Sequence, residues 1–297
     1  MWYQGSPRMS NPTGTLYIVA TPIGNLGDLS PRAGDILSRV ELIAVEDTRH
    51  SARLLDTAKI RTPLTAFHDH NATTRTREIV KRLEAGDNVA LICDAGTPLI
   101  SDPGYRLVRA AQAAGIAVRT VPGPSAVVAA LAVAGLPSDR FAFEGFLPAR
   151  AAARRKRLAE LVHDPRTLVF YEAPHRLGAT LADCATAFGG EREAVLAREL
   201  TKLHETVRRA PLDALVRLVE NGEEPARGEC VILVSGAAVQ PRNDEEESET
   251  LLRALLAEGV GVKTAAAVAR RLTDRPRREL YQRALELERQ INTEQNL

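Results

Sequence analysis

Five short polar segments carry the residue types that could bind a ligand or do chemistry. In chain order they are ATPIGNLGD (20–28), EDTRHS (46–51), FHDHN (67–71), CDAGTPLISDPG (93–104) and VPGPSA (121–126). Glycine lets backbone approach a ligand, proline stiffens a loop, and Ser, Thr and Asp side chains supply hydrogen bonds. Any one such segment is most often just a turn, so their meaning depends on where the fold places them.

Several familiar site types are absent from these segments. Gly24 and Gly27 do not complete a G-x-G-x-x-G pattern, so a nicotinamide or flavin fingerprint is missing. No G-K-[ST] sequence is present, which excludes a P-loop for nucleoside triphosphates. Ser125 lacks the second glycine of a nucleophile elbow and is a poor candidate for a hydrolase nucleophile.

The histidines and cysteines do not have metal-ligand spacing either. His68 and His70 flank Asp69 at an expected strand end, but such a loop pair is more often solvated than metal-bound. No metal is therefore expected. The three cysteines lie far apart in the chain, as suits a reducing compartment, and cytoplasmic location is the default expectation.

Each polar segment follows an apolar run that reads as a β-strand. The expected strands are 15–21, 41–47, 63–67, 88–93 and 116–121, and helical patterns separate them, the first beginning at Ser30-Pro31. Strands that alternate with helices of about a dozen residues indicate βαβ units and a mostly parallel sheet. The five segments then meet at the carboxyl edge of that sheet, where open α/β sheets bind ligands.

The rest of the chain predicts a second α/β domain and a helical end. Mixed strands are expected at 167–174, 193–200 and 229–236, with a strongly basic helix at 150–162. The expected organisation is a disordered extension (1–13), an N-terminal α/β domain (14–135), a C-terminal α/β domain (136–240), a linker (241–250) and a helical, RNA-binding extension (251–297). The extension has apolar residues at helical spacing and suits a small helix-turn-helix.

At this point the motifs resemble a known family. VATPIGNLGD, AVEDTRHSARLL, CDAGTPLISDPG, TVPGPSAVVAALAVAGLP, FYEAPHRL and RELTKLHE together resemble the tetrapyrrole-methylase-like superfamily, and within it the ribosomal RNA small subunit methyltransferase I family. The resemblance runs from about Thr15 to Gly236, and GVKTAAAVARRL with ELYQRAL resembles that family's C-terminal extension. It implies two α/β domains with S-adenosyl-L-methionine in the cleft between them. It also implies 2′-O-methylation of a cytidine ribose in the decoding region of small-subunit (16S) ribosomal RNA, by a homodimer.

The family's cofactor region can be carried over onto matching positions. The resemblance implies cofactor binding by residues of three loops and of the second domain: Pro22, Gly24, Asp94, Gly96, Thr97, Ser101, Asp102, Ser125, Ala126, Tyr171 and Glu172. Ser125 and Ala126 stand at a helix start, whose N–H groups suit a carboxylate. For each residue taken alone, turn formation is the alternative.

A neutral ribose hydroxyl is a poor nucleophile, so a group that accepts its proton would help. RELTKLHE (198–205) supplies Glu199 and Lys202 near an expected strand end, and either is a candidate base or oxygen-positioning group. Two alternatives stay open: positioning alone suffices for an already activated methyl donor, or these two residues simply form a surface ion pair.

RNA binding requires local positive charge, because the 39 Lys and Arg nearly balance the 38 Asp and Glu. The candidate phosphate contacts are Arg154, Arg155, Lys156 and Arg157 in the basic helix, and Arg270, Arg271, Arg277 and Arg278 in the C-terminal extension. A solvated helix face is the ordinary role of such clusters. Aromatic content of 4% argues against a row of stacked bases and favours a folded ribosomal surface.

Two rival functions remain. A methylase of a small molecule such as a tetrapyrrole intermediate would share the fold and the cofactor, but it needs neither basic cluster. A non-enzymatic nucleic-acid-binding module would need no pocket at the sheet edge. The expected partners are therefore small-subunit ribosomal RNA, or the assembling 30S subunit, and a second copy of the chain, with no membrane.

Overall fold

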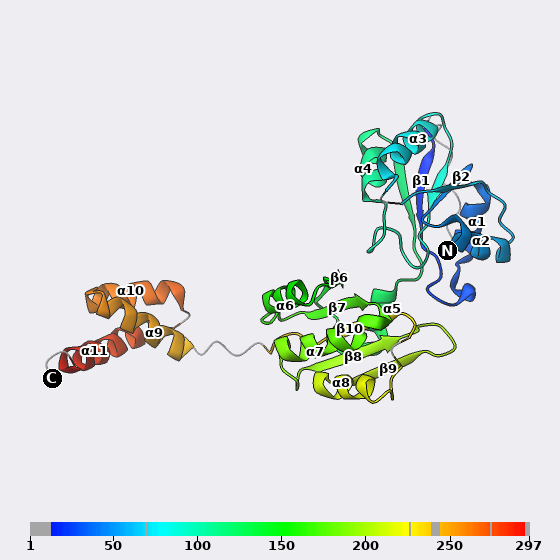
Figure 1. Cartoon of the computed structure of the whole chain (residues 1–297). Helices are drawn as coiled ribbons and strands as arrows, with labels where there is room; N and C mark the ends of the chain where they lie inside the picture. Colours follow the sequence, from blue (N-terminus) through cyan, green and yellow to red (C-terminus); the bar gives the residue numbers. More distant parts are fainter. Residues whose placement is uncertain (1–12, 69, 226, 239–243, 274, 295–297) are drawn as a thin grey trace, which may run out of the picture. The chain divides into compact units, whose positions relative to one another are not determined.

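The computed structural model describes residues 13–68, 70–225, 227–238, 244–273 and 275–294 (Figure 1). The chain divides into two compact units, Met1–Ala237 and Ala238–Leu297, and each is described by itself. The expected N-terminal extension (1–13) lies outside the described residues except for Thr13. Among the described residues, no helix combines the length and the apolar character that crossing a membrane requires.

The first unit contains a five-stranded parallel sheet in the order β3-β2-β4-β1-β5. Its strands are β1 (Thr15–Val19), β2 (Leu42–Val45), β3 (Leu64–Ala66), β4 (Val89–Leu91) and β5 (Ala117–Val121). The helices between and after them are α1 (Pro31–Arg39), α2 (Thr48–Thr57), α3 (Ala72–Glu84), α4 (Tyr105–Ala113) and α5 (Ala126–Ala134), with a short 3-10 turn η1 (Leu26–Asp28). The expected parallel α/β arrangement is confirmed.

Local chemistry explains where these helices begin. The Ser30 hydroxyl accepts a hydrogen bond from the Ala33 N–H at 3.1 Å, and Pro31 occupies the first turn of α1. The Asp47 carboxylate caps α2 by accepting from the N–H groups of Arg49 (2.7 Å) and His50 (3.3 Å). The Asp47 cap lies two residues after β2, which fixes the first turn of α2 beside the sheet edge, whereas the Ser30 cap follows the longer loop that contains η1.

Alternate strand residues pack into two hydrophobic cores on opposite faces of this sheet. Leu16 and Leu91 pack with Ile79 of α3 and Leu107 of α4 on one face. On the other face, Val19, Ile43 and Ile92 pack with Leu37 of α1 and Leu55 of α2. Such cover on both faces is what a parallel sheet requires, and it leaves the strand ends as the open edge.

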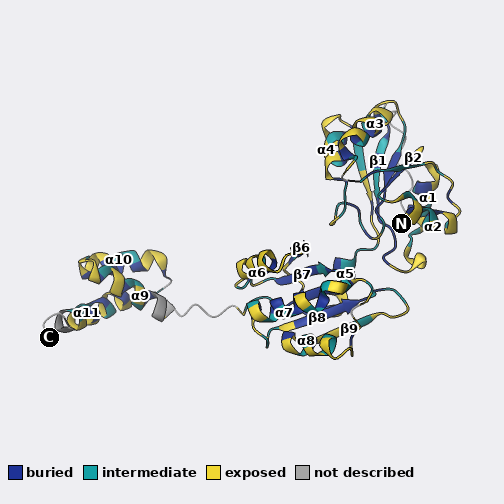
Figure 2. Ribbon diagram, in the orientation of Figure 1, coloured by how far each residue is buried: buried dark blue, intermediate teal, exposed yellow. Residues whose placement is uncertain are grey.

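The second sheet of this unit is mixed, in the order β6-β7-β10-β8-β9. Its strands are β6 (Phe141–Phe146), β7 (Thr167–Glu172), β8 (Glu193–Arg198), β9 (Thr206–Pro211) and β10 (Cys230–Val234), and only β6 and β7 pair in parallel. The helices are α6 (Ala151–Glu160), α7 (Leu177–Phe188) and α8 (Leu212–Glu220), with a 3-10 turn η2 (Pro174–Arg176) before α7. The central strands of this sheet are buried (Figure 2).

The helix α5 packs on this second sheet, although the expected boundary at residue 135 placed it with the first. Its Val127, Ala130 and Leu131 join Val195 and Val231 in one core, while α7 and α8 cover the opposite face. The sequence of α5, AVVAALAVA, is apolar on every side, so it can pack against whichever sheet its preceding loop reaches. The loop 121–126 therefore joins the edge of the first sheet to the second.

The second unit is a group of three helices, α9 (Asp244–Ala257), α10 (Val262–Leu272) and α11 (Arg277–Glu294). Their shared core includes Leu252, Ala265, Ala269, Leu280 and Leu287. The helix α9 begins inside the 241–250 segment that was expected to be a linker. The acidic run there favours a helix start, because glutamate has good helix propensity and negative charge is stabilising in the first turn.

Candidate active site

Three loops at the carboxyl edge of the first sheet are tied together by hydrogen bonds. Thr21 and Gly96 form a two-way backbone bridge, with N···O distances of 2.8 and 3.1 Å. The Thr21 hydroxyl donates to the Cys93 carbonyl at 3.1 Å, and the Thr97 hydroxyl donates to the Pro124 carbonyl at 3.0 Å. The loops after β1, β4 and β5 therefore form one platform.

A pocket of about 370 Å3, here called pocket A, opens between this platform and the ends of β7 and β10. Eight of the eleven residues expected to bind the cofactor line it: Gly96, Thr97, Ser101, Asp102, Ser125, Ala126, Tyr171 and Glu172. Residues from both sheets share the lining because α5 connects them. Pocket A is thus where the structure brings most of the expected site together.

A second pocket of about 400 Å3, here called pocket B, adjoins pocket A. Pro22, Gly24 and Asp94 lie there, together with Lys202 and residues of α2, rather than with the other eight. Ile23, Ala95 and Glu229 line both pockets. Two ligands could therefore meet at this shared wall, one from each side.

The electrostatics of pocket A favour a cationic ligand. Burial raises the pKa of Asp102 above its usual range, and the nearby Asp94 charge raises this pKa further, while a hydrogen bond from Cys93 opposes both effects. A positive charge bound in pocket A would favour the ionised carboxylate and offset this cost. Burial also raises the pKa of Tyr171 to about 12, so its hydroxyl stays neutral beside the backbone of Val127.

The start of α5 supplies the complementary site for an anionic group. Ser125, its N-cap residue, makes no side-chain capping bond, and Ser125 and Ala126 both line pocket A. Backbone N–H groups at a helix start attract a carboxylate. Leu99 and Ser101, on the opposite loop, hold positive φ angles of 74° and 67°, strained values that cluster at ligand sites.

The two candidate catalytic residues form an ion pair at the edge of pocket B. The Lys202 ammonium lies 2.8 Å from Glu199 Oε1 and 3.2 Å from Glu229 Oε2. The same Glu199 oxygen accepts from the Glu229 N–H at 2.9 Å. The aliphatic part of Lys202 lies across Gly24, where an added Cβ would stand 2.4 Å from Lys202 Cγ. The lysine thus joins the first loop of one domain to the second domain.

Both members of this pair are ionised at neutral pH. Burial lowers the pKa of Lys202, but its contacts with Glu199 and Glu229 outweigh burial and leave the pKa above its usual range. Burial raises the pKa of Glu199, and the Lys202 and Glu229 hydrogen bonds more than reverse this. Lys202 is therefore a hydrogen-bond donor and not a base at neutral pH.

Comparisons with known proteins agree with this geometry. The family model for tetrapyrrole (corrin/porphyrin) methylases matches residues 15–216, and a model for the RsmI C-terminal HTH domain matches residues 242–288. The ribosomal RNA small subunit methyltransferase I of Xylella fastidiosa (strain Temecula1) is 56% identical over 92% of this chain and 99% of its own. The protein of that name from Escherichia coli O157:H7 is 47% identical over 93% of this chain and 96% of its own.

The chain belongs to the ribosomal RNA small subunit methyltransferase I family.

Solved structures agree at the level of the fold. Uroporphyrin-III-C-methyltransferase from Thermus thermophilus matches with a TM-score of 0.52 at 23% identity, covering 75% of this chain and 94% of its own. The methyltransferase CobJ matches with a TM-score of 0.57 at 20% identity, covering 77% of this chain and 96% of its own. The expected tetrapyrrole-methylase fold is confirmed, and the family's methyl donor is S-adenosyl-L-methionine.

Pocket A fits this donor. The donor carries a sulfonium and an ammonium, which suit the half-buried Asp102, and a carboxylate, which suits the open N–H groups at the start of α5. Phe146 and Ile100 add apolar wall for the adenosine portion. The residues present thus match both kinds of charge that the donor carries within one pocket.

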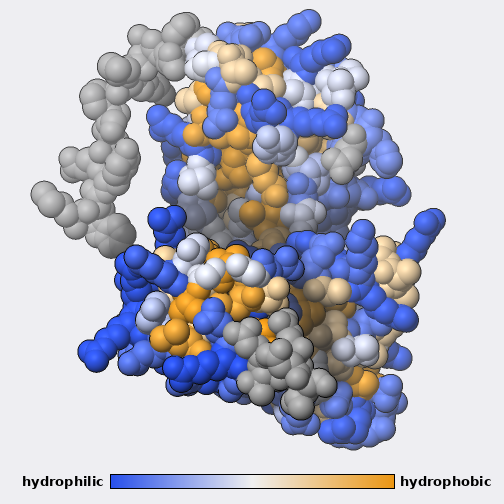
Figure 3. Space-filling model, turned by 90° about the vertical axis from the view of Figure 1, so that its left-hand side faces the viewer, coloured by the Kyte–Doolittle hydropathy of each residue, from blue (hydrophilic) through white to orange (hydrophobic). Residues whose placement is uncertain are grey.

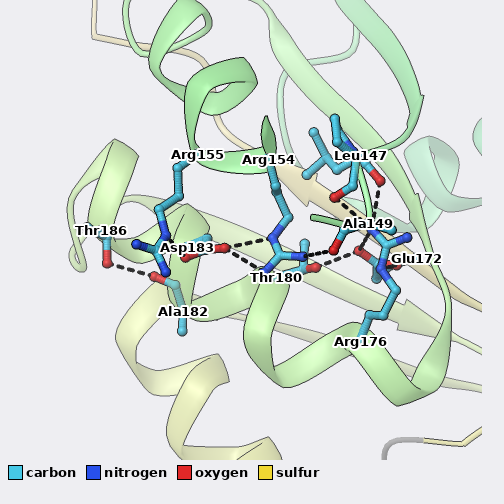
Figure 4. A network of polar contacts seen from close by, with 11 residues as sticks. Leu147, Ala149, Arg154, Arg155, Glu172, Arg176, Thr180, Ala182, Asp183 and Thr186 are labelled. Atoms are coloured by element: carbon cyan, nitrogen blue, oxygen red, sulfur yellow. Dashed lines mark hydrogen bonds and ion pairs between the residues drawn. The ribbon is translucent and has the colours of Figure 1, made fainter. Parts of the chain in front are cut away.

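The carboxylate of Glu172 is already engaged by protein groups (Figure 4). It accepts hydrogen bonds from Thr180 Oγ1 and the Ala173 N–H, and it pairs with Arg176 at 3.1 Å. The Glu172 carboxylate is therefore already occupied, and the expected contact with the cofactor would be made by its backbone and carbon atoms. Its charge holds the end of β7 to η2 and α7.

The basic helix α6 is not one uniform binding face. The Arg154 side chain is only 6% exposed and pairs with Asp183 of α7 at 2.6 Å, and Arg155 pairs with the same carboxylate at 2.9 Å (Figure 4). Arg157 binds Glu144 and Glu160. Arg154 is therefore a buried structural residue rather than a phosphate contact, because its charge is enclosed and neutralised. Lys156 is exposed, so it remains a candidate contact to an RNA phosphate.

The four arginines expected to bind RNA in the C-terminal extension are exposed. Arg270 and Arg271 end α10, and Arg277 and Arg278 begin α11, so they gather around one turn of the second unit. The turn lies within the part matched by the helix-turn-helix model.

The sequence did not reveal the part of the site formed by Gly228, Glu229, Cys230 and Val231. These residues begin β10, which runs antiparallel to β7 and β8, and Cys230 pairs with both Glu172 and Arg198. An antiparallel neighbour brings its first residues to the edge where the other strands end. The available signal was the run ECVILVSG, but its pairing partners could not be read from it.

We predict that Gly24→Ala displaces Lys202 and lowers the rate of methyl transfer at least about tenfold. The added methyl would overlap the Lys202 side chain and Thr201 Oγ1, and these can shift without unfolding the domain. Kinetic assays together with urea unfolding would measure both effects. Gly34→Ala is the matched control, since its Cβ meets open space on α1; it should add about 0.5–1 kcal/mol of stability and keep full activity. Full activity of Gly24→Ala would contradict the arrangement.

We predict that Arg154→Ala lowers the free energy of unfolding by about 3–5 kcal/mol, because it removes one partner of a buried ion pair. Lys156→Ala, two positions away on the exposed face of α6, should change it by no more than about 0.5 kcal/mol. Urea denaturation of both variants would measure the two changes in the free energy of unfolding. Equal stability of the two would show that the Arg154–Asp183 pair does not hold α6 to α7.

Proposed function

We propose that this protein transfers a methyl group from S-adenosyl-L-methionine in pocket A to the ribose 2′-oxygen of a cytidine in the decoding region of 16S ribosomal RNA. The observation that carries the proposal is the wall that the two pockets share. Ile23, Ala95 and Glu229 line both, so a donor on one side and an acceptor on the other would be adjacent. Membership of the family supplies the reaction class.

The bound donor supplies an activated methyl group and a neutral leaving group. The protein then has to align the donor with the acceptor oxygen and to exclude water from the site. Asp102 and the start of α5 hold the two charged ends of the donor, and the strained loop at Leu99–Ser101 keeps the pocket shape fixed. The positive φ angles of Glu199 (51°) and Thr201 (68°) show a similarly constrained turn on the acceptor side.

Lys202 positions the acceptor oxygen as a hydrogen-bond donor, and Glu199 positions Lys202. The ammonium lines pocket B and is held by two carboxylates, which restricts where its remaining N–H points. The proton that leaves the ribose hydroxyl has carboxylates within the same pocket, Asp94 and Glu229. The amide N–H of Asp47 contacts Asp94 at 3.3 Å, which fixes that carboxylate beside α2.

Capture of RNA is assigned to the exposed basic groups. Arg270, Arg271, Arg277 and Arg278 around the α10–α11 turn suit phosphate contacts, and Lys156 of α6 adds a further cation. Arg155 is two-thirds exposed even while paired with Asp183 and can contribute at the rim. The substrate is the RNA of the small subunit or of the assembling 30S particle, which places the reaction in the cytoplasm.

The size and polarity of pocket B favour RNA over a tetrapyrrole as the methyl acceptor. A volume of about 400 Å3 lies at the lower end of the roughly 300–1,000 Å3 typical of small-molecule sites. It suits one nucleotide better than a macrocycle of four pyrrole rings with their carboxylate arms. The cations Arg53 and Lys202 line it, and they suit phosphate as well. A purely RNA-binding module would have no use for pocket A.

We propose that a second copy of the chain covers the exposed apolar side chains of α5 and β6. The side chains of α5 are apolar all round, yet Val128 and Val133 are 61% and 51% exposed. Phe141 and Phe146 of β6 are exposed as well. A separate apolar area lies on the surface in the upper half of Figure 3, and the dimer proposal does not rest on it. A homodimer that covers α5 would remove its exposed side chains from water.

The proposed reaction predicts one labelled nucleotide. Incubation of the protein with methyl-labelled donor and small subunits that lack the modification should label a single cytidine, resistant to alkaline cleavage because its 2′-oxygen is blocked. Mapping by mass spectrometry of nuclease fragments would locate it. Label on a base, or no transfer to RNA, would overturn the proposal.

Two variants separate capture from transfer in that experiment. Replacing Arg270, Arg271, Arg277 and Arg278 by glutamine should raise KM roughly tenfold or more and leave kcat nearly unchanged, because these residues only bind phosphates. Lys202→Gln should lower kcat and leave KM nearly unchanged, because Lys202 acts on the reacting oxygen.

We predict that the wild-type chain is a dimer at micromolar concentration and that Val128→Glu is a folded monomer. Val128 is exposed within one copy, so the new charge affects only the partner surface. Sedimentation equilibrium measures the mass. Leu272→Glu, an equally exposed position at the end of α10, is the control and should stay dimeric. A monomeric wild type would end the dimer proposal.

A further inference from the structure

Pocket B contains a buried hydroxyl that no other group of the described residues satisfies. Ser51 is 2% exposed, lines the pocket, and its Oγ has no hydrogen-bond partner among the residues that the structure describes. An unpaired buried hydroxyl destabilises a folded protein, because it has lost its hydrogen bonds to water. A ligand group that bonds to Ser51 would remove this cost.

The surroundings of Ser51 hold it in place. It lies in the first turns of α2, where its backbone N–H bonds to the Asp47 carbonyl at 3.0 Å. The Asp47 carboxylate caps the helix, and the Asp47 N–H contacts Asp94 across the loops. The backbone of Ser51 therefore has a fixed position beside the loops that line pocket B.

The other lining residues of pocket B divide into two kinds. Ile23, Leu26 and Leu54 provide apolar surface that suits the flat face of a base. Arg53, an exposed side chain of α2, and the Lys202 ammonium provide positive charge, and the exposed His50 ring adds a hydrogen-bonding group. A nucleotide has this same division, an apolar ring face with polar edges and an anionic phosphate.

We infer that pocket B binds one nucleotide of the RNA, turned out of its stack, with its phosphate near Arg53 and a polar group of the nucleotide bonded to Ser51. The inference rests on the proposed function and names how the acceptor enters. Enzymes that act on a nucleobase turn the nucleotide out of its stack into a pocket, and the inference applies the same principle to the nucleotide whose ribose is methylated. The pocket volume of about 400 Å3 accommodates a single nucleotide and little more.

The test uses the full-length protein, small subunits that lack the modification, and two variants. Ser51→Ala should lower kcat/KM about tenfold, equivalent to one hydrogen bond, and Arg53→Gln should raise KM several-fold. Neither should change the affinity for S-adenosyl-L-homocysteine measured by calorimetry, because pocket A is intact. Ser51→Ala should also keep or raise the melting temperature of the free protein, since it removes an unsatisfied hydroxyl; a Ser51 that merely stabilised the fold would lower it.

Matched controls are Ser38→Ala, an exposed serine of α1, and Arg61→Gln, an exposed arginine beyond α2; both should behave as wild type. Wild-type kcat/KM in both Ser51→Ala and Arg53→Gln would overturn the inference and leave the proposed function standing. Loss of S-adenosyl-L-homocysteine affinity in these variants would also overturn it, because pocket B would then belong to the donor. Failure of the wild-type chain to methylate small subunits would remove both proposals together.

Discussion

Lys202 lies across Gly24 while Glu199 and Glu229 hold its ammonium, and the two pockets keep their relation through this contact. Gly24 belongs to the loop after β1, and the two carboxylates belong to the ends of β8 and β10. The contact therefore joins the edge of the parallel sheet to the edge of the mixed sheet at the position where donor and acceptor would meet. It is only partly exposed, so salt screens it less than a surface ion pair.

Other charges along the same edge are held in a similar way. Glu224 is buried and accepts from Arg198, Thr206 and Arg208, and these contacts more than offset the rise in its pKa caused by burial. Arg154 with Asp183 holds α6 to α7, and Arg176 with Glu172 holds η2 to the end of β7. Buried pairs of this kind add little net stability, but removing one partner is costly, and this makes the geometry of the edge specific.

Much of the fold could be predicted from the sequence because its causes are local. Alternating apolar runs and helical patterns predicted the parallel sheet, and the Ser30-Pro31 pair predicted the start of α1. The rule that ligands bind at the carboxyl ends of parallel strands predicted which loops would meet. Six of the eight expected cofactor residues in pocket A come from these loops, whereas the set of residues itself was carried over from the family resemblance.

The remaining features depend on tertiary contacts that a single sequence does not contain. The start of β10 reaches the site through antiparallel pairing with β7 and β8. The helix α5 packs on the second sheet because every side of it is apolar. Arg154 looks like its neighbours Arg155 and Lys156 in the sequence, and only the position of Asp183 on α7 makes it a buried residue. The edge strand β9 was missed because its exposed arginines hide the alternation.

The central claim is that donor and acceptor occupy adjoining pockets and meet at Ile23, Ala95 and Glu229. A crystal structure of the full chain with S-adenosyl-L-methionine tests it most directly. The account predicts that the donor fills pocket A and that its transferable methyl faces pocket B across this wall. A donor seated in pocket B, or a methyl that points away from the wall, would contradict it.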